Sequence, residues 1–106
     1  MKIIQMDKIK GKKNKRGVIA KELINHENTK VMNLELTPGD HVPHHKVPVD
    51  VFFYIVSGKG TIQIGKEKSV VEAKDIVLCP PNTKMALWAD QAEDFIVLNV
   101  KTPNIK

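Results

Sequence analysis

The stretch from residue 38 to residue 60, PGDHVPHHKVPVDVFFYIVSGKG, decides how this chain folds. It opens with a turn at residues 38–40, because proline presets φ and glycine tolerates positive φ. Three of the four histidines follow in a segment interrupted by prolines, and an apolar, β-prone run occupies residues 51–56. Residues 57–60 predict a turn that ends this strand. Histidines on an irregular segment that leads into a buried strand indicate a site inside a β-barrel.

Length and composition place the chain among ordinary globular domains. A chain of 106 residues with 42% hydrophobic residues is large enough for one domain with a core that needs no disulfide. The single cysteine, Cys79, excludes an internal disulfide, fits a reducing compartment and is expected to be a buried, inert thiol. The N-terminus lacks the apolar run of a signal peptide, and no segment approaches the roughly 18 apolar residues that span a bilayer. We therefore expect a soluble, cytoplasmic protein without a membrane partner.

The positive charge is concentrated near the N-terminus. The net charge is +5, and residues 8–16, KIKGKKNKR, contain six basic residues and no acidic one. Such a run can bind nucleic acid, but here it has no aromatic side chain to stack on bases, and no recognition helix is visible elsewhere. The run therefore reads as a solvated edge or turn, where lysines also protect a sheet edge from aggregation. We expect no nucleic-acid partner.

The hydrophobic pattern is that of short strands. Met32, Leu34 and Leu36 alternate with polar residues, which predicts a half-buried strand. No stretch shows apolar residues at helical spacing over three turns. Short strands separated by Gly, Pro and Asn turns indicate an all-β sandwich or small closed barrel. The predicted strands occupy residues 2–5, 18–24, 31–36, 51–56, 61–64, 69–72, 76–79, 84–88 and 95–100.

Two segments together resemble the small single-domain members of the cupin superfamily. The first cupin motif, Gly, His-x-His, Glu and Gly at set spacings, is approached by Gly39, His44-His45, Val51 and Gly58. The second is approached by residues 74–85, KDIVLCPPNTKM. The resemblance implies a cupin-type double-stranded β-helix, or jelly-roll barrel, with its site in the barrel mouth. Residues 1–106 would form one domain, with N-terminal strands and a basic turn in residues 1–30 and the barrel in residues 31–100.

The resemblance also implies a homodimer. Small cupins commonly pair through the outer sheet and the N-terminal strands. The apolar side chains at positions 52, 54 and 56 are predicted to face outward and would need such a cover.

The metal-binding part of the family pattern is incomplete. In most cupins two histidines, a glutamate and a later histidine bind one divalent transition metal. Here the glutamate position falls on Val51 and the last histidine position on Met85, while the His-x-His pair falls on His44 and Lys46 or on His45 and Val47. Valine offers no ligand, a protonated lysine repels a cation, and a thioether suits Cu(I) rather than Mn or Fe(II). The cofactor is accordingly either one divalent transition metal, held by His44 and His45, or none.

Three functional hypotheses follow from this pattern. The first is a barrel that binds a small molecule in its mouth without the usual four-ligand metal. The second is a metal-dependent cupin enzyme of the dioxygenase, isomerase or decarboxylase type, with a rearranged site at His44 and His45. The third is a purely structural or regulatory interaction module without a ligand. For His44 and His45 themselves, the alternative to a site role is that both are loop histidines at the surface. The predicted ligand-binding residues are His44, His45, Phe53, Ile55, Met85 and Leu87.

Overall fold

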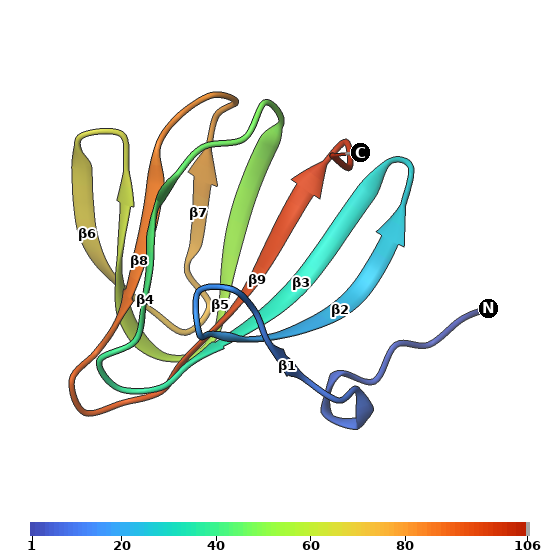
Figure 1. Cartoon of the computed structure of the whole chain (residues 1–106), viewed down its shortest axis with the longest axis horizontal. Coiled ribbons are helices and arrows are strands. Elements are labelled where there is room, and N and C mark those ends of the chain that lie inside the picture. The colour runs from blue at the N-terminus through green and yellow to red at the C-terminus, as the bar shows by residue number, and fades with distance from the viewer. Residues whose placement is uncertain (106) are drawn as a thin grey trace.

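A computed structural model describes residues 1–105 of the chain, which consist almost entirely of strands (Figure 1). A single 3-10 turn, η1 (Met6–Lys8), precedes them. The strands are β1 (Lys12–Lys13), β2 (Ile19–His26), β3 (Thr29–Leu36), β4 (His41–His45), β5 (Asp50–Ile64), β6 (Glu67–Glu72), β7 (Ile76–Cys79), β8 (Met85–Ala89) and β9 (Phe95–Thr102). No helix in residues 1–105 has the length and apolarity needed to cross a membrane.

The strands form one curled antiparallel sheet. Its order is β1-β2-β3-β9-β5-β8-β4, and β6 and β7 also pair with β5. The first half of β5 pairs with β9 and β7, and its second half pairs with β8 and β6. The sheet thereby folds over on itself and encloses a core. This arrangement confirms the predicted all-β fold of the jelly-roll type.

The continuity of β5 corrects one prediction. Residues 57–60 are not a turn that ends a strand but a bend inside a single 15-residue strand. The pairing with β9 shifts register between Ile55 and Ser57, which marks a β-bulge. Gly58 has φ +80°, and a Cβ there would overlap the carbonyl oxygen of Asp94. At Gly60 a Cβ would lie 2.5 Å from the Phe95 ring, so both glycines permit a close crossing of strands.

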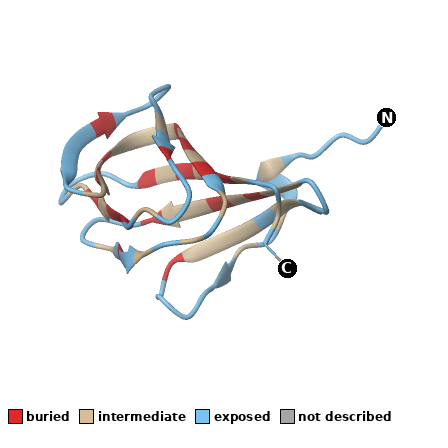
Figure 2. Cartoon of the chain, turned by 90° about the horizontal axis from the view of Figure 1, so that it is seen from above, coloured by how far each residue is buried: buried red, intermediate tan, exposed pale blue. Residues whose placement is uncertain are grey.

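The two-residue period of the strands decides what lies inside the barrel. In the first half of β5 the buried residues are Val51, Phe53 and Ile55, whereas Asp50 is exposed, as the alternation predicts. The inward residues of β9 and β8 meet them, so the buried positions line the inner faces of the ribbon (Figure 2). The core contains Leu36, Val42, Val51, Phe53, Ile55, Ile62, Cys79, Met85, Leu87, Phe95 and Val97.

The N-terminal segment differs from the sequence-based prediction. Residues 2–5 form no strand, and the chain instead enters η1 and then the short β1, which pairs with the start of β2. The Lys21 ammonium donates a hydrogen bond to the carbonyl of Met6 (3.3 Å) and ties the segment to the sheet. The isolated hydrophobic pair at positions 3 and 4 is too short to specify pairing when no neighbouring strand offers a register. The basic turn after β1 is held by Asn14, whose Oδ1 accepts the backbone N–H groups of Arg16 and Val18.

Candidate ligand-binding site

A β-bulge in β4 separates the two adjacent histidines. Val42 pairs with Leu87 and His45 pairs with Met85, so three steps along β4 match two steps along β8. In a regular strand His44 would share the inner face with Val42. The extra residue moves His45 to that face and turns His44 outward. Of the two alignments left open by the sequence, the structure matches the one that pairs His45 with Val47, which packs against the core.

His44 belongs to a different environment from His45. Its Nε2 lies 3.2 Å from Oε1 of Gln63, and its ring meets the ring of Trp88 edge to face, with centroids 5.8 Å apart. The ammonium of Lys68 lies 4.3 Å from the centroid of the Trp88 ring. These contacts are on the outer face of the sheet, and His44 is exposed. The structure therefore does not bring His44 and His45 to one site.

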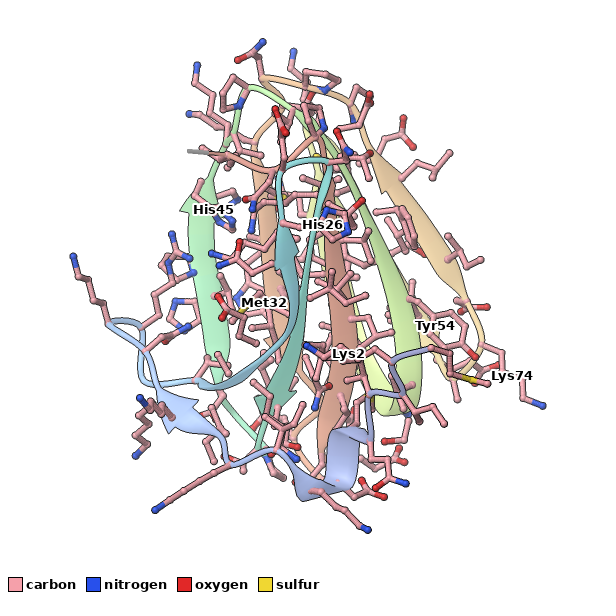
Figure 3. All side chains as sticks on the ribbon, turned by 90° about the vertical axis from the view of Figure 1, so that its right-hand side faces the viewer. Lys2, His26, Met32, His45, Tyr54 and Lys74 are labelled. Carbon is pink, nitrogen blue, oxygen red and sulfur yellow. The ribbon has the colours of Figure 1, made fainter. Side chains whose placement is uncertain are left out.

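His45 lines a cavity of about 200 Å³, whose other lining residues come from the basic turn and from β2, β3, β4, β8 and β9. Figure 3 shows the side chain of His45 on β4, on the same side of the molecule as Met32, whereas Tyr54 lies on the opposite side. One part of the lining is aliphatic, and the other part, the rim, is polar and cationic. The apolar lining consists of Ala20, Met32, Leu34, Val42 and Leu87, and the polar lining consists of Asn14, Arg16, Lys30, His45, Asn99 and Lys101.

The register of β3 and β9 places two lysines side by side at this rim. Lys30 and Lys101 are direct cross-strand partners, and both line the cavity. The Lys101 ammonium donates to Oδ1 of Asn99 (3.1 Å), a neutral acceptor. The residues that line the cavity include no aspartate or glutamate. The ion pairs within residues 1–105 lie elsewhere, between Lys21 and Glu35 and between Lys59 and the acids at positions 90 and 93.

Burial and like charge lower the pKa values of two groups in the cavity, Lys101 and His45. Burial is the main cause that lowers the pKa of the Lys101 ammonium, and the charges of Lys30 and Arg16 lower it further. Burial likewise lowers the pKa of His45, opposed by its bond to the Pro43 carbonyl and assisted by Arg16 and Lys101. Because a carbonyl only accepts, Nδ1 of His45 carries the proton in that 3.0 Å hydrogen bond. In the neutral ring Nε2 is therefore the acceptor.

The other predicted site residues lie in the core. Phe53, Ile55, Met85 and Leu87 are fully buried. Leu87 reaches the wall of the cavity at His45, whereas the other three pack with the core cluster. Cys79 is also buried, and burial raises the pKa of its thiol, as expected for an unreactive cysteine.

The side chains in the barrel do not fit the metal of the cupin family. Within residues 1–105 no three His, Cys, Asp or Glu side chains converge on one point. The positions expected for a glutamate and a histidine ligand are occupied by Val51 and Met85, both buried and without a hard donor. The one imidazole in the cavity shares it with Arg16, Lys30 and Lys101. Those cations would repel a divalent metal ion.

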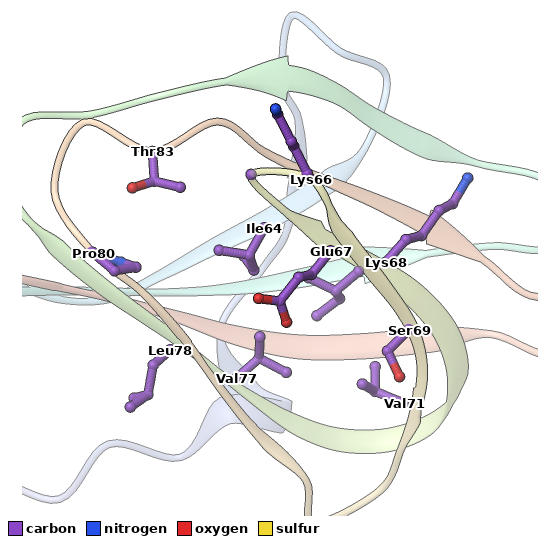
Figure 4. A pocket seen from close by; sticks show the side chains of 12 residues that line it. Ile64, Lys66, Glu67, Lys68, Ser69, Val71, Val77, Leu78, Pro80 and Thr83 are labelled. Atoms are coloured by element: carbon purple, nitrogen blue, oxygen red, sulfur yellow. The ribbon is translucent and has the colours of Figure 1, made fainter.

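A larger hollow of about 560 Å³ opens between β6 and β7 (Figure 4). Its lining includes the aliphatic side chains of Ile64, Val71 and Val77, together with Lys66 from the β5–β6 turn and Glu67 from the start of β6. Its lining contains no histidine. The cavity at His45 is smaller but combines enclosure with convergent polar groups, which is the usual character of a specific site.

The sequence reading missed the residues that give the cavity its charge. The sequence pattern assigns Arg16 to the solvated basic turn and carries no signal for Lys30, Asn99 or Lys101. Alternation in the sequence shows that residues 30 and 32 share one face of β3 and that residues 99 and 101 share one face of β9. Only the pairing of β3 with β9 shows that these four side chains lie on the same face of the sheet.

Comparisons with known proteins agree with this architecture. The family model described as a cupin domain matches residues 32–101. KdgF from Halomonas sp. has a TM-score of 0.90 at 16% identity, covering 100% of this chain and 96% of that chain. An RmlC-like cupin from Shewanella frigidimarina has a TM-score of 0.87 at 13% identity, covering 100% and 95%. A predicted oxalate decarboxylase from Thermotoga maritima has a TM-score of 0.86 at 19% identity, covering 97% and 100%.

At these identities the structural likeness shows the fold alone. A comparison with curated protein sequences finds no match.

The lowered pKa of His45 predicts a pH-dependent stability. Below its ordinary pKa of about 6.5 the unfolded chain binds a proton that the native His45, next to Arg16 and Lys101, binds less well. The contribution of this histidine is therefore complete above pH 6.5 and falls as the pH is lowered toward its native pKa. We expect the melting temperature of His45→Gln to fall less steeply than that of the wild type between pH 7 and pH 5. The control His44→Gln, on the exposed face, should keep the wild-type slope, and equal slopes in all three proteins would contradict the assignment.

Proposed function

This chain belongs to the cupin family, and we propose that it binds a small molecule in the barrel mouth, in the cavity at His45, without the four-ligand metal site. The observation that carries the proposal is the cavity itself, with an aliphatic inner wall and polar groups from β3, β4 and β9 at its rim. Apolar enclosure supplies affinity, and a few fixed polar groups supply orientation. A volume of about 200 Å³ is below the roughly 300–1,000 Å³ of sites for drug-sized molecules, which favours a small metabolite.

A cavity-filling variant tests this proposal. Ala20 lines the cavity, and Ala20→Phe adds a ring at its wall. A small molecule found by a thermal-shift screen of metabolites should stabilise the wild type by several degrees at saturating concentration, because it binds only the native state. The same molecule should stabilise Ala20→Phe much less than the wild type. It should stabilise Ala92→Phe as much as the wild type, because that substitution is in an exposed loop. A complete screen without any hit, or hits that are indifferent to Ala20→Phe, would instead favour the third hypothesis, an interaction module without a ligand.

Metal content separates this proposal from a metal-dependent enzyme. That alternative, of the dioxygenase, isomerase or decarboxylase type, requires His44 and His45 to converge. The outward direction of His44 and the cations around His45 argue against it. We expect less than about a tenth of an equivalent of iron, manganese, nickel, copper or zinc in untagged protein purified without chelators, measured by inductively coupled plasma mass spectrometry. About one equivalent, lost in His44→Ala/His45→Ala, would establish the rearranged metal site and make the enzyme the leading hypothesis.

We also propose that the outer sheet face pairs with a second copy of this chain. A hollow of about 440 Å³ on that face is lined by residues without charge, among them Phe52, Tyr54 and Ile76. The N-terminal segment covers it in part through Ile4 and Met6, while Ile76 stays 62% exposed. Two copies of an uncharged face can meet about a two-fold axis without the repulsion that a net charge of +5 creates elsewhere.

The proposed dimer is tested by one lysine substitution. Ile76→Lys places a charge on the apolar face, and we expect it to shift a dimer at micromolar concentration to a monomer in sedimentation velocity. Val70 on β6 is similarly exposed, at 65%, but does not line this hollow, so Val70→Lys should sediment like the wild type. A wild-type protein that sediments as a monomer at that concentration would refute the dimer.

A further inference from the structure

The cationic rim of the cavity is an arrangement that folding alone does not favour. Lys30 and Lys101 are directly opposite each other on neighbouring antiparallel strands. Like charges in such a cross-strand pair destabilise a sheet. Arg16 adds a third positive charge to the same cavity. A sheet position that only needed solubility would be satisfied equally well by a neutral polar residue or by one lysine.

No acidic side chain offsets these charges. The residues that line the cavity include no carboxylate. Glu22 lines the adjacent hollow, and its Oε1 accepts a hydrogen bond from Asn25 (2.9 Å) rather than from a cation of this cavity. Lys101 is half-buried, and its hydrogen-bond partner within residues 1–105 is the amide oxygen of Asn99. Buried charges are normally paired, so the rim lacks the negative charge that would complete it.

We propose that the molecule bound in this cavity is a small oxyanion, a carboxylate or a phosphate, held between Lys30 and Lys101 and met by Arg16 at the rim. This inference rests on the proposed function, since it names the ligand class of the same cavity. The anion would replace the missing counter-charge and convert a repulsive cross-strand pair into two charge-assisted contacts. The aliphatic wall of Met32, Leu34 and Leu87 would take the uncharged part of the ligand.

Two further groups would orient such a ligand. The Asn99 amide oxygen is engaged by Lys101, which leaves its amide nitrogen as a donor toward the cavity. His45 commits Nδ1 to the Pro43 carbonyl, which leaves Nε2 as an acceptor for a hydroxyl or an acid proton of the ligand. The cavity therefore suits an anion that also carries a hydroxyl or a second acid group.

Anion titrations of charge-matched variants test the inference. Thermal shift and isothermal titration calorimetry are carried out with succinate, malonate and inorganic phosphate, with chloride keeping the ionic strength constant and with glycerol and glucose as neutral probes. We expect at least one oxyanion to raise the wild-type melting temperature saturably, by about 5 °C or more. The best anion of the panel then shows whether the site takes a carboxylate or a phosphate.

Substitution of each cavity lysine tests whether the anion-induced shift depends on this cavity. Lys101→Met and Lys30→Met should each abolish most of the anion-induced shift. Each should also raise the melting temperature of the ligand-free protein by about 2–4 °C, because it removes a like-charge contact. A merely structural lysine would lower that temperature instead. Lys84→Met removes one charge from an exposed position outside the cavity and should leave both quantities unchanged.

Three outcomes would overturn the oxyanion proposal, and they differ in what they imply for the proposed function. Equal anion effects in the wild type, Lys84→Met and Lys101→Met would reveal non-specific screening and overturn it. A neutral ligand that binds in an Ala20→Phe-sensitive way, with no oxyanion competing, would overturn it and leave the proposed function standing. Failure of neutral and anionic molecules alike would overturn both.

Discussion

The architecture depends on one bent strand. β5 is long enough to belong to both halves of the curled sheet, and it pairs with four other strands along its 15 residues. The bend requires a bulge and a residue with positive φ at the place where the loop that precedes Phe95 comes closest to β5. Glycine at position 58 satisfies both conditions, because any side chain there would occupy the space of the Asp94 carbonyl. The enclosed core, and hence the cavity, exists because this strand passes from one half of the curled sheet to the other without ending.

The second constraint is the strict alternation of side chains along each strand. It directs Val51, Phe53 and Ile55 into the core and leaves Asp50 outside. In β4 the same alternation is broken by one residue, and the break decides which histidine enters the barrel. β4 is an edge strand, where a bulge and a proline are tolerated because one side makes no ladder. Local irregularity at an edge thus determines the chemistry of the interior.

The cavity differs from the usual metal site of the family both in the residues that line it and in the sign of their charge. A divalent cation needs convergent lone pairs and negative charge, whereas this cavity presents donors and positive charge. Val51 occupies the position expected for the carboxylate ligand, and the cavity is lined by the cations of Arg16, Lys30 and Lys101. Both features disfavour a bound metal ion. A barrel that keeps its shape while its lining changes from acceptors to donors illustrates why the cupin fold alone does not specify an activity.

The amino-acid pattern was enough to predict the all-β class, the positions of most strands along the chain, the alternating faces of residues 50–55 and the incomplete metal motif. These features are local, because they follow from alternation, turn residues and spacing within short segments. Three features required the folded structure: residues 57–60 bend a strand rather than end it, residues 2–5 are not a strand, and His45 rather than His44 lines the cavity. The folded structure alone also joined Arg16 and Lys30 to Lys101, which are far apart in the sequence. The physical reason is that register and bulges are set by pairing with distant strands, and one residue of shift moves a side chain to the opposite face.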